Sequence, residues 1–202
     1  MTVVIGLTGG IASGKSVVSQ MLAERGVLII DADKVGHEAY RRGSGCYEAV
    51  VEAFGQDVVG ADGEIDRKAL GAKVFGDPAQ RKRLEGIVWP WMRETMDKRL
   101  AQIRAEGKPV VVLEAAVLIE AGWVPITDQV WVVTVAPEIA RQRVMERNGL
   151  TSEQASARID AQLTNAERAK HAQVTIDNSG TLDELKQRVL GEWEKLTGAA
   201  AH

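Results

Sequence analysis

The strongest constraint on this chain is a glycine-rich segment near its beginning, Gly9-Gly-Ile-Ala-Ser-Gly-Lys-Ser16. It matches the pattern G-x-x-x-x-G-K-[ST] in full, and it stands between an apolar run and residues with helical spacing. Glycines let the backbone curve round an anion with several N–H groups turned inward, and a helix N-terminus adds a positive dipole end. A glycine-rich structural turn is the alternative, but the context that a phosphate cradle requires is present. The segment therefore predicts a site for the phosphates of a nucleoside triphosphate.

Residue types within the cradle indicate its chemistry. Lys15 supplies a mobile positive charge for the β- and γ-phosphates, and Ser16 supplies a hydroxyl to Mg²⁺. The residues predicted to hold the nucleotide are Gly10, Ile11, Ala12, Ser13, Gly14, Lys15, Ser16 and Val17.

Short apolar runs alternate with helical patterns along the whole chain. This alternation predicts an α/β fold: a three-layer sandwich with a five-stranded parallel sheet and helices on both faces. The predicted strands are 3–8, 27–30, 110–113, 130–135 and 174–176. The predicted helices start after the cradle and then cover 33–42, 47–54, 67–74, 78–106, 137–147 and 181–196. Pro90 should kink or split the long helix, because proline cannot donate the backbone hydrogen bond there.

One segment differs in composition from the rest of the chain. Residues 151–172 are polar and helix-forming, with only Ile159 and Leu163 as large apolar side chains. They predict a pair of surface helices, either a lid over the site or a plain solvated pair. The end of the chain, 198–202, is small and featureless and reads as a frayed tail.

Carboxylates follow the second predicted strand. Asp31 and Asp33 stand at its C-terminal end, the edge where ligands bind in such sheets. One of them is placed to accept a proton from an attacking hydroxyl. The alternative is a helix N-cap, and it is stronger for Asp31. His37, one helical turn beyond Asp33, either touches substrate or is structural.

Arginines and one glutamate complete the candidate set. Arg143 and Arg147 lie one turn apart in a predicted helix, so they either clamp a transferring phosphoryl group or form a solvated basic face. The third predicted strand is followed by Glu114 rather than by the aspartate common beside such cradles. Glu114 either takes an outer-sphere metal role or simply begins a turn.

Composition excludes several classes of protein. The formal net charge is -3, which argues against a protein that mainly neutralises nucleic-acid phosphates. Cys46 is the only cysteine, so no internal disulfide forms, and a reducing, cytoplasmic location is expected. One cysteine and three scattered histidines make a zinc site improbable. No signal peptide, membrane helix or guanine-reading N-K-x-D motif is found.

Several motifs together resemble the dephospho-CoA kinase family over about residues 2–196. They are Gly6-Leu-Thr-Gly-Gly-Ile-Ala-Ser-Gly-Lys-Ser16, Val27-Leu-Ile-Ile-Asp-Ala-Asp33, Ile65-Asp-Arg67, Leu113-Glu-Ala-Ala-Val-Leu-Ile-Glu-Ala-Gly122, Arg143 with Arg147-Asn-Gly-Leu-Thr151, Arg158 with Gln162, and Ile176-Asp-Asn-Ser179. Two motifs are most similar to the kinase half of bifunctional CoA synthases, namely Trp89-Pro90 and Ala115-Ala-Val-Leu118. The adenylyltransferase half of those proteins is absent here.

The resemblance implies ATP-dependent phosphorylation of the ribose 3′-hydroxyl of dephospho-CoA, with ATP and Mg²⁺ as cofactors. It implies catalytic roles for Asp33 as base, for Lys15, and for the arginines Arg143 and Arg147. It places Asn178 in a loop near the adenine, and the residues expected to contact the acceptor are Thr8, Asp33, His37 and Arg67. Another small-molecule kinase, or a nucleotide switch without phosphoryl transfer, remains the alternative.

The resemblance also implies a domain plan. The expected plan is a single P-loop kinase domain over 1–198, with an acceptor-side helical region at about 33–106, a lid at about 148–172 and a disordered tail at 199–202. A monomer or weak homo-oligomer is expected, with a small-molecule substrate and neither nucleic acid nor membrane as partner.

Overall fold

Strand β1 (Val3–Gly9) lies at the centre of a five-stranded sheet in the computed structural model, which describes residues 2–199. The strand order is β2-β3-β1-β4-β5, and the pairs β1–β3, β1–β4 and β4–β5 are parallel. The other strands are β2 (Leu28–Asp31), β3 (Val110–Glu114), β4 (Gln129–Thr134) and β5 (Val174–Asp177). The α/β fold and the five-stranded sheet are therefore confirmed.

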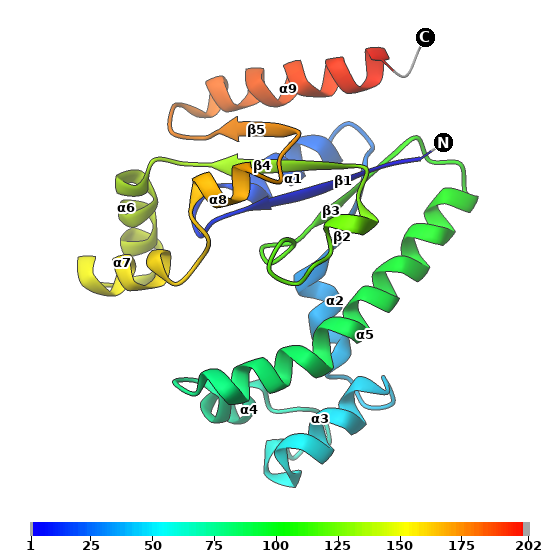
Figure 1. The fold of residues 1–202 in the computed structure, drawn as a ribbon, viewed down its shortest axis with the longest axis vertical. Coiled ribbons are helices and arrows are strands. Elements are labelled where there is room, and N and C mark those ends of the chain that lie inside the picture. Colours follow the sequence, from blue (N-terminus) through cyan, green and yellow to red (C-terminus); the bar gives the residue numbers. More distant parts are fainter. Residues whose placement is uncertain (1, 200–202) are drawn as a thin grey trace. The chain divides into compact units, whose positions relative to one another are not determined.

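One face of the sheet builds the main hydrophobic core. Alternate strand residues such as Ile5, Leu7 and Val112 pack there against apolar side chains of α1 (Lys15–Ala23) and α9 (Leu182–Ala199). Figure 1 shows α9 running beside β5, the edge strand. Because strand side chains alternate between faces, this apolar spacing fixes the register of the sheet.

The opposite face is covered by the segment that follows β3. A β-carbon added at Gly6 would lie 2.7 Å from Leu118 and 2.8 Å from Thr127, so glycine permits this close approach. The segment includes the 3₁₀ turn η2 (Val124–Ile126) and the buried Trp123, and α8 (Asn165–Ala169) packs against β4. The layer on this side is thus a loop with short helices.

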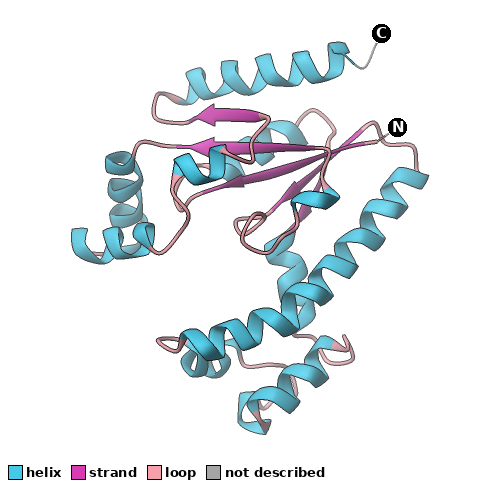
Figure 2. Ribbon diagram, in the orientation of Figure 1, coloured by secondary structure: helices cyan, strands magenta, loops and turns pink. Residues whose placement is uncertain are grey.

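The chain divides into two compact units. The first contains the sheet and consists of the residues before Asp31 and after Ala105; the second is Asp31–Ala105. Figure 2 shows helices and loops in the second unit. They are α2 (Ala32–Ala39), α3 (Cys46–Phe54), the 3₁₀ turn η1 (Gln56–Val58), α4 (Arg67–Val74) and α5 (Pro78–Ala105).

Pro90 lies inside α5, which stays one continuous helix of 28 residues. Of the two outcomes predicted at Pro90, a kink or a split, the split is wrong, because packing against α2, α3 and α4 holds both halves in place. Figure 1 shows the axis of α5 changing direction along its length, as a kink at a proline requires.

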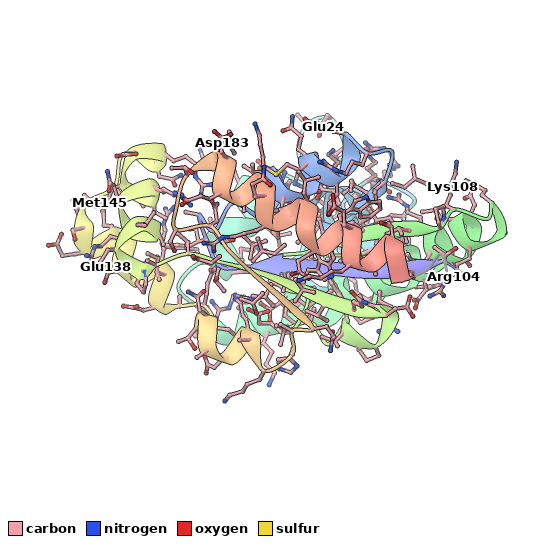
Figure 3. The ribbon with its side chains drawn as sticks, turned by 90° about the horizontal axis from the view of Figure 1, so that it is seen from above. Glu24, Arg104, Lys108, Glu138, Met145 and Asp183 are labelled. Atoms are coloured by element: carbon pink, nitrogen blue, oxygen red, sulfur yellow. The ribbon has the colours of Figure 1, made fainter. Side chains whose placement is uncertain are left out.

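The remaining helices follow β4. α6 (Pro137–Asn148) begins at a proline and ends at Gly149, whose φ of 63° suits glycine. α7 (Ser152–Asp160) and α8 form the helix pair predicted for 151–172. Figure 3 labels Glu138 and Met145 on α6 and Asp183 in the first turn of α9. The helix α9 includes Gly198 and Ala199, so the frayed tail was placed too early; residues 200–202 lie outside the described part.

Candidate active site

The phosphate loop joins the end of β1 to the start of α1, in the predicted context. Gly14 precedes α1 with a φ of 88°, and a β-carbon there would lie 2.1 Å from Asn178 Nδ2. Both the backbone angle and this contact require glycine. The loop closes on itself through a hydrogen bond from Ser13 N to Gly10 O at 3.1 Å.

Two predicted residues support the loop from behind. Asn178 is buried and donates from Nδ2 to Ser13 O at 2.7 Å. Arg143 donates to Ala12 O at 3.3 Å and to Asn178 O at 3.0 Å. The structure therefore brings Arg143 and Asn178 together at the loop, where they brace its carbonyl groups. Arg147, in the last turn of the same helix, is exposed, and its Nε donates to Asn148 Oδ1 at 3.4 Å.

Glu114 is the centre of a polar cluster at the loop. Its Oε1 accepts hydrogen bonds from Lys15 Nζ at 2.6 Å and from Ser16 Oγ at 2.9 Å. Burial by itself would raise the pKa of Glu114, but hydrogen bonds from Lys15, Ser19 and Ser16, with the charge of Lys15, lower it below its ordinary value. Glu114 is thus a carboxylate that faces the two cradle residues assigned to phosphate and metal.

The hydroxyl of Thr8 is not available to a substrate. Thr8 is fully buried, and its Oγ1 donates to Ala116 O at 3.3 Å. The hydroxyl fastens the end of β1 to the segment after β3. The expected contact between this side chain and the acceptor is therefore incompatible with its burial.

The predicted acceptor residues belong to the second unit. Asp33 and His37 are exposed on α2, one turn apart, and Arg67 is exposed at the first position of α4. Asp31 is the N-cap of α2 and accepts hydrogen bonds from Asp33 N and Lys34 N. The capping alternative therefore applies to Asp31, and it leaves the carboxylate of Asp33 uncommitted.

Cys46 behaves as an inert thiol. It is 3% exposed, and burial, followed by the charge of Glu48, raises its pKa to about 11. A reactive thiolate at neutral pH requires the opposite shift.

The segment after α7 touches the phosphate loop directly. Ile11 N donates to Gln162 Oε1 at 2.7 Å. Just beyond, Asn165 Nδ2 donates to Val135 O at 2.9 Å, and Arg168, 1% exposed, pairs with Glu120 at 3.0 Å. α8 is therefore anchored to the sheet, so the plain solvated alternative is wrong for this half of the pair.

These hydrogen-bond partners could not be predicted from residue types and spacing. Gln162 is 151 positions from Ile11, and Glu120 is 48 positions from Arg168, so no spacing rule links them. The only signal was the presence of Gln162 and Glu120 in the motifs that carry the family resemblance.

Residues 2–199 contain neither a membrane-spanning helix nor a cluster of metal-binding side chains. No helix there has both the length and the apolar character needed to cross a bilayer. No three His, Cys, Asp or Glu side chains in that range gather as a cage for a metal ion.

Comparison with known proteins gives concordant matches. The family description "Dephospho-CoA kinase" matches residues 3–184. A dephospho-CoA kinase of Geobacter sulfurreducens is 48% identical over 192 residues, covering 95% of this chain and 98% of that one. A Thermus thermophilus structure has a TM-score of 0.80 at 34% identity, covering 96% of this chain and 97% of the other. A dephospho-CoA kinase structure from Campylobacter jejuni has a TM-score of 0.76 at 27% identity, covering 98% and 100%.

Proposed function

The chain belongs to the dephospho-CoA kinase family, and we propose that it transfers the γ-phosphoryl group of ATP to the ribose 3′-hydroxyl of dephospho-CoA. The products are coenzyme A and ADP. The observation that carries the proposal is the phosphate loop with Lys15 and Ser16 hydrogen-bonded to Glu114, within a family match over residues 3–184.

ATP occupies the loop Gly10–Val17 in this proposal. Backbone N–H groups and the N-terminus of α1 meet the phosphates, and Lys15 neutralises their charge. Asn178 and Arg143 keep the loop in shape from behind, as their hydrogen bonds to Ser13 O and Ala12 O support.

Mg²⁺ fits the oxygen donors beside the loop. Ser16 Oγ and Glu114 Oε1 lie 2.9 Å apart, and Mg²⁺ at nucleotide sites takes one or two protein oxygens together with phosphate and water oxygens. Ser16 would hold the ion, with Glu114 close by. When bound, Mg²⁺ neutralises charge on the β- and γ-phosphates.

Asp33 is the base in this mechanism. Its exposed carboxylate begins α2 two residues after β2, and its neighbour Asp31 already provides the helix cap. Asp33 accepts the proton of the attacking 3′-hydroxyl, while His37 and Arg67 contact the acceptor. Arg147, which is exposed, stabilises the negative charge that develops on the transferring phosphoryl group. Arg143 supports the loop, and its positive charge also stabilises that group.

The segment at about 148–172 acts as the lid in this proposal. The hydrogen bond between Gln162 and Ile11 N supports this role, because it attaches the segment to the loop that holds ATP. A closed lid excludes water and prevents hydrolysis of ATP. We further propose a cytoplasmic protein that is a monomer or a weak homo-oligomer.

The test is product identification. The purified protein is incubated with ATP, Mg²⁺ and dephospho-CoA, and mass spectrometry should show one added phosphate on the ribose 3′ position. Parallel reactions with shikimate and with nucleoside monophosphates test the alternative acceptors. Preference for another acceptor would refute the proposal, and ATP binding without phosphoryl transfer would indicate a nucleotide switch.

A further inference from the structure

A pocket of about 390 Å³ lies in the first unit, beside the phosphate loop. Its walls are mainly apolar, and they include Ile11, Val135, Pro137, Ala140, Ile159 and Leu163. The volume is within the range of small-molecule sites. Because Gly10 and Ile11 belong to both the pocket and the loop, a ligand part in this pocket lies next to the bound phosphates.

Fixed hydrogen bonds hold the walls of the pocket together. Gln162 accepts from Ile11 N, and Asn165 donates to Val135 O. Thr164 caps α8 by accepting from Glu167 N and lies on the same wall. The pocket is thus built by paired groups from the loop, the end of β4 and the segment after α7.

The remaining polar groups define what the pocket can bind. Asp160 lines it with an exposed carboxylate, which disfavours phosphate groups. Gln162 uses only its Oε1, so its amide Nε2 has no partner among the described residues. Apolar walls with one free amide donor suit an uncharged aliphatic chain that carries carbonyl groups.

We propose that this pocket binds the pantetheine arm of the acceptor, an inference that rests on the proposed function. Of the two substrates, ATP offers a purine, a ribose and charged phosphates. Only the acceptor has an uncharged arm in which aliphatic segments, including two geminal methyl groups, alternate with amides. The 3′-hydroxyl of the acceptor must reach the γ-phosphate, which brings the rest of the molecule within range of a pocket that shares Ile11 with the loop.

The thiol at the end of this arm provides a direct test. Ala166 lines the pocket and is exposed, whereas Ala169 is exposed in the same helix and does not line it. Ala166→Cys and its matched control Ala169→Cys are treated with dephospho-CoA activated as a 2-pyridyl disulfide. The engineered thiolate attacks the sulfur of the arm, a new disulfide forms, and pyridine-2-thiol leaves with the electron pair of the broken bond.

Binding in the pocket raises the local concentration of the activated arm, so Ala166→Cys should gain the mass of the adduct at least about tenfold faster than Ala169→Cys. A small pyridyl disulfide without the nucleotide corrects for differences in thiol reactivity. Unmodified dephospho-CoA should slow the fast labelling. The unmodified protein gives the background, which stays low because Cys46 is buried.

Equal corrected rates for the two variants, or labelling that free dephospho-CoA does not slow, would overturn the proposal. A kinetic measurement adds a second check. Ala166→Leu should raise KM for dephospho-CoA about tenfold and KM for ATP less than twofold, while Ala169→Leu changes neither. Labelling does not depend on catalysis, so absence of dephospho-CoA phosphorylation by the unmodified protein would refute the proposed function separately.

Discussion

At the scale of single residues, Asp33 carries the clearest chemical prediction. Asp33→Asn should keep ATP binding but lower kcat for dephospho-CoA by about 10²- to 10⁴-fold, because an amide cannot accept the proton of the hydroxyl. Titration calorimetry with ATP and steady-state kinetics measure the two quantities. The matched control is Asp31→Asn, which retains a capping side chain on α2 and should alter kcat little. Turnover unchanged in Asp33→Asn would remove the base assignment.

Glu114 links stability to pH through its interaction with Lys15 and Ser16. Glu114→Gln keeps the size of the side chain but loses its charge, so the free energy of unfolding at pH 7 should fall by about 1–3 kcal/mol. The folded-state pKa of Glu114 is lowered. Its stabilisation is therefore present above the unfolded-state pKa and is lost as pH falls through the folded-state value.

Urea unfolding at pH 7 and at stepwise lower pH measures this difference. The gap between the unmodified protein and Glu114→Gln should close as the solution becomes acidic. A gap that stays constant into acid would show that the carboxylate charge is not its source.

The role of a single residue could be predicted only where its neighbours in the sequence determine that role. The roles of Lys15 and Ser16 follow from their positions in one short loop. The role of Glu114 could not be predicted, because its partners Lys15 and Ser16 lie in α1, about 100 positions away, and only the pairing of β3 with β1 brings them together. The burial of Thr8 could not be predicted either, since the segment that covers it lies more than 100 positions away in the sequence.

At the scale of elements, apolar runs predicted every strand to within one residue at each end. The central strands β1, β3 and β4 are buried on both faces, so they are continuous runs of apolar and β-branched residues. The sequence around Pro90 could not decide between a kink and a split, because the choice depends on the packing of α5 against three helices. The attachment of α8 to the rest of the first unit could not be predicted, since it depends on the ion pair between Arg168 and Glu120.

The anchor of α8 makes a prediction about the element as a whole. Glu120→Ala leaves the guanidinium of Arg168, 1% exposed, without its carboxylate, and should lower the free energy of unfolding by about 3 kcal/mol. The matched control is Glu94→Ala, which removes an exposed carboxylate paired with Lys98 and should change stability little. Chemical denaturation of both variants gives the comparison. Equal small effects would mean that water replaces Glu120 at the buried arginine.

At the scale of the whole molecule, the residues proposed for the donor and those proposed for the acceptor fall into different compact units. All nucleotide-binding residues assigned to ATP lie before Asp31 or after Ala105, whereas Asp33, His37 and Arg67 lie in Asp31–Ala105. The composition of the chain gives no sign of this division, because it describes all 202 residues together. It became predictable only through the family resemblance, which assigned about 33–106 to the acceptor.

Hydrogen exchange can test this division with the two substrates added in turn. ATP with Mg²⁺ should slow exchange in Gly10–Val17, which meets the phosphates, and in the segment 148–172, which is the proposed lid over this loop, while α2 and α4 exchange as before. Dephospho-CoA added with a non-hydrolysable ATP analogue should then protect α2 around Asp33 and His37 and the start of α4 at Arg67. Protection by dephospho-CoA confined to the first unit would contradict the assignment of the acceptor to Asp31–Ala105. Lys15→Ala provides the control, since it should lose the protection by ATP in the loop without changing exchange in α5, which lies in the other unit and packs against α2, α3 and α4.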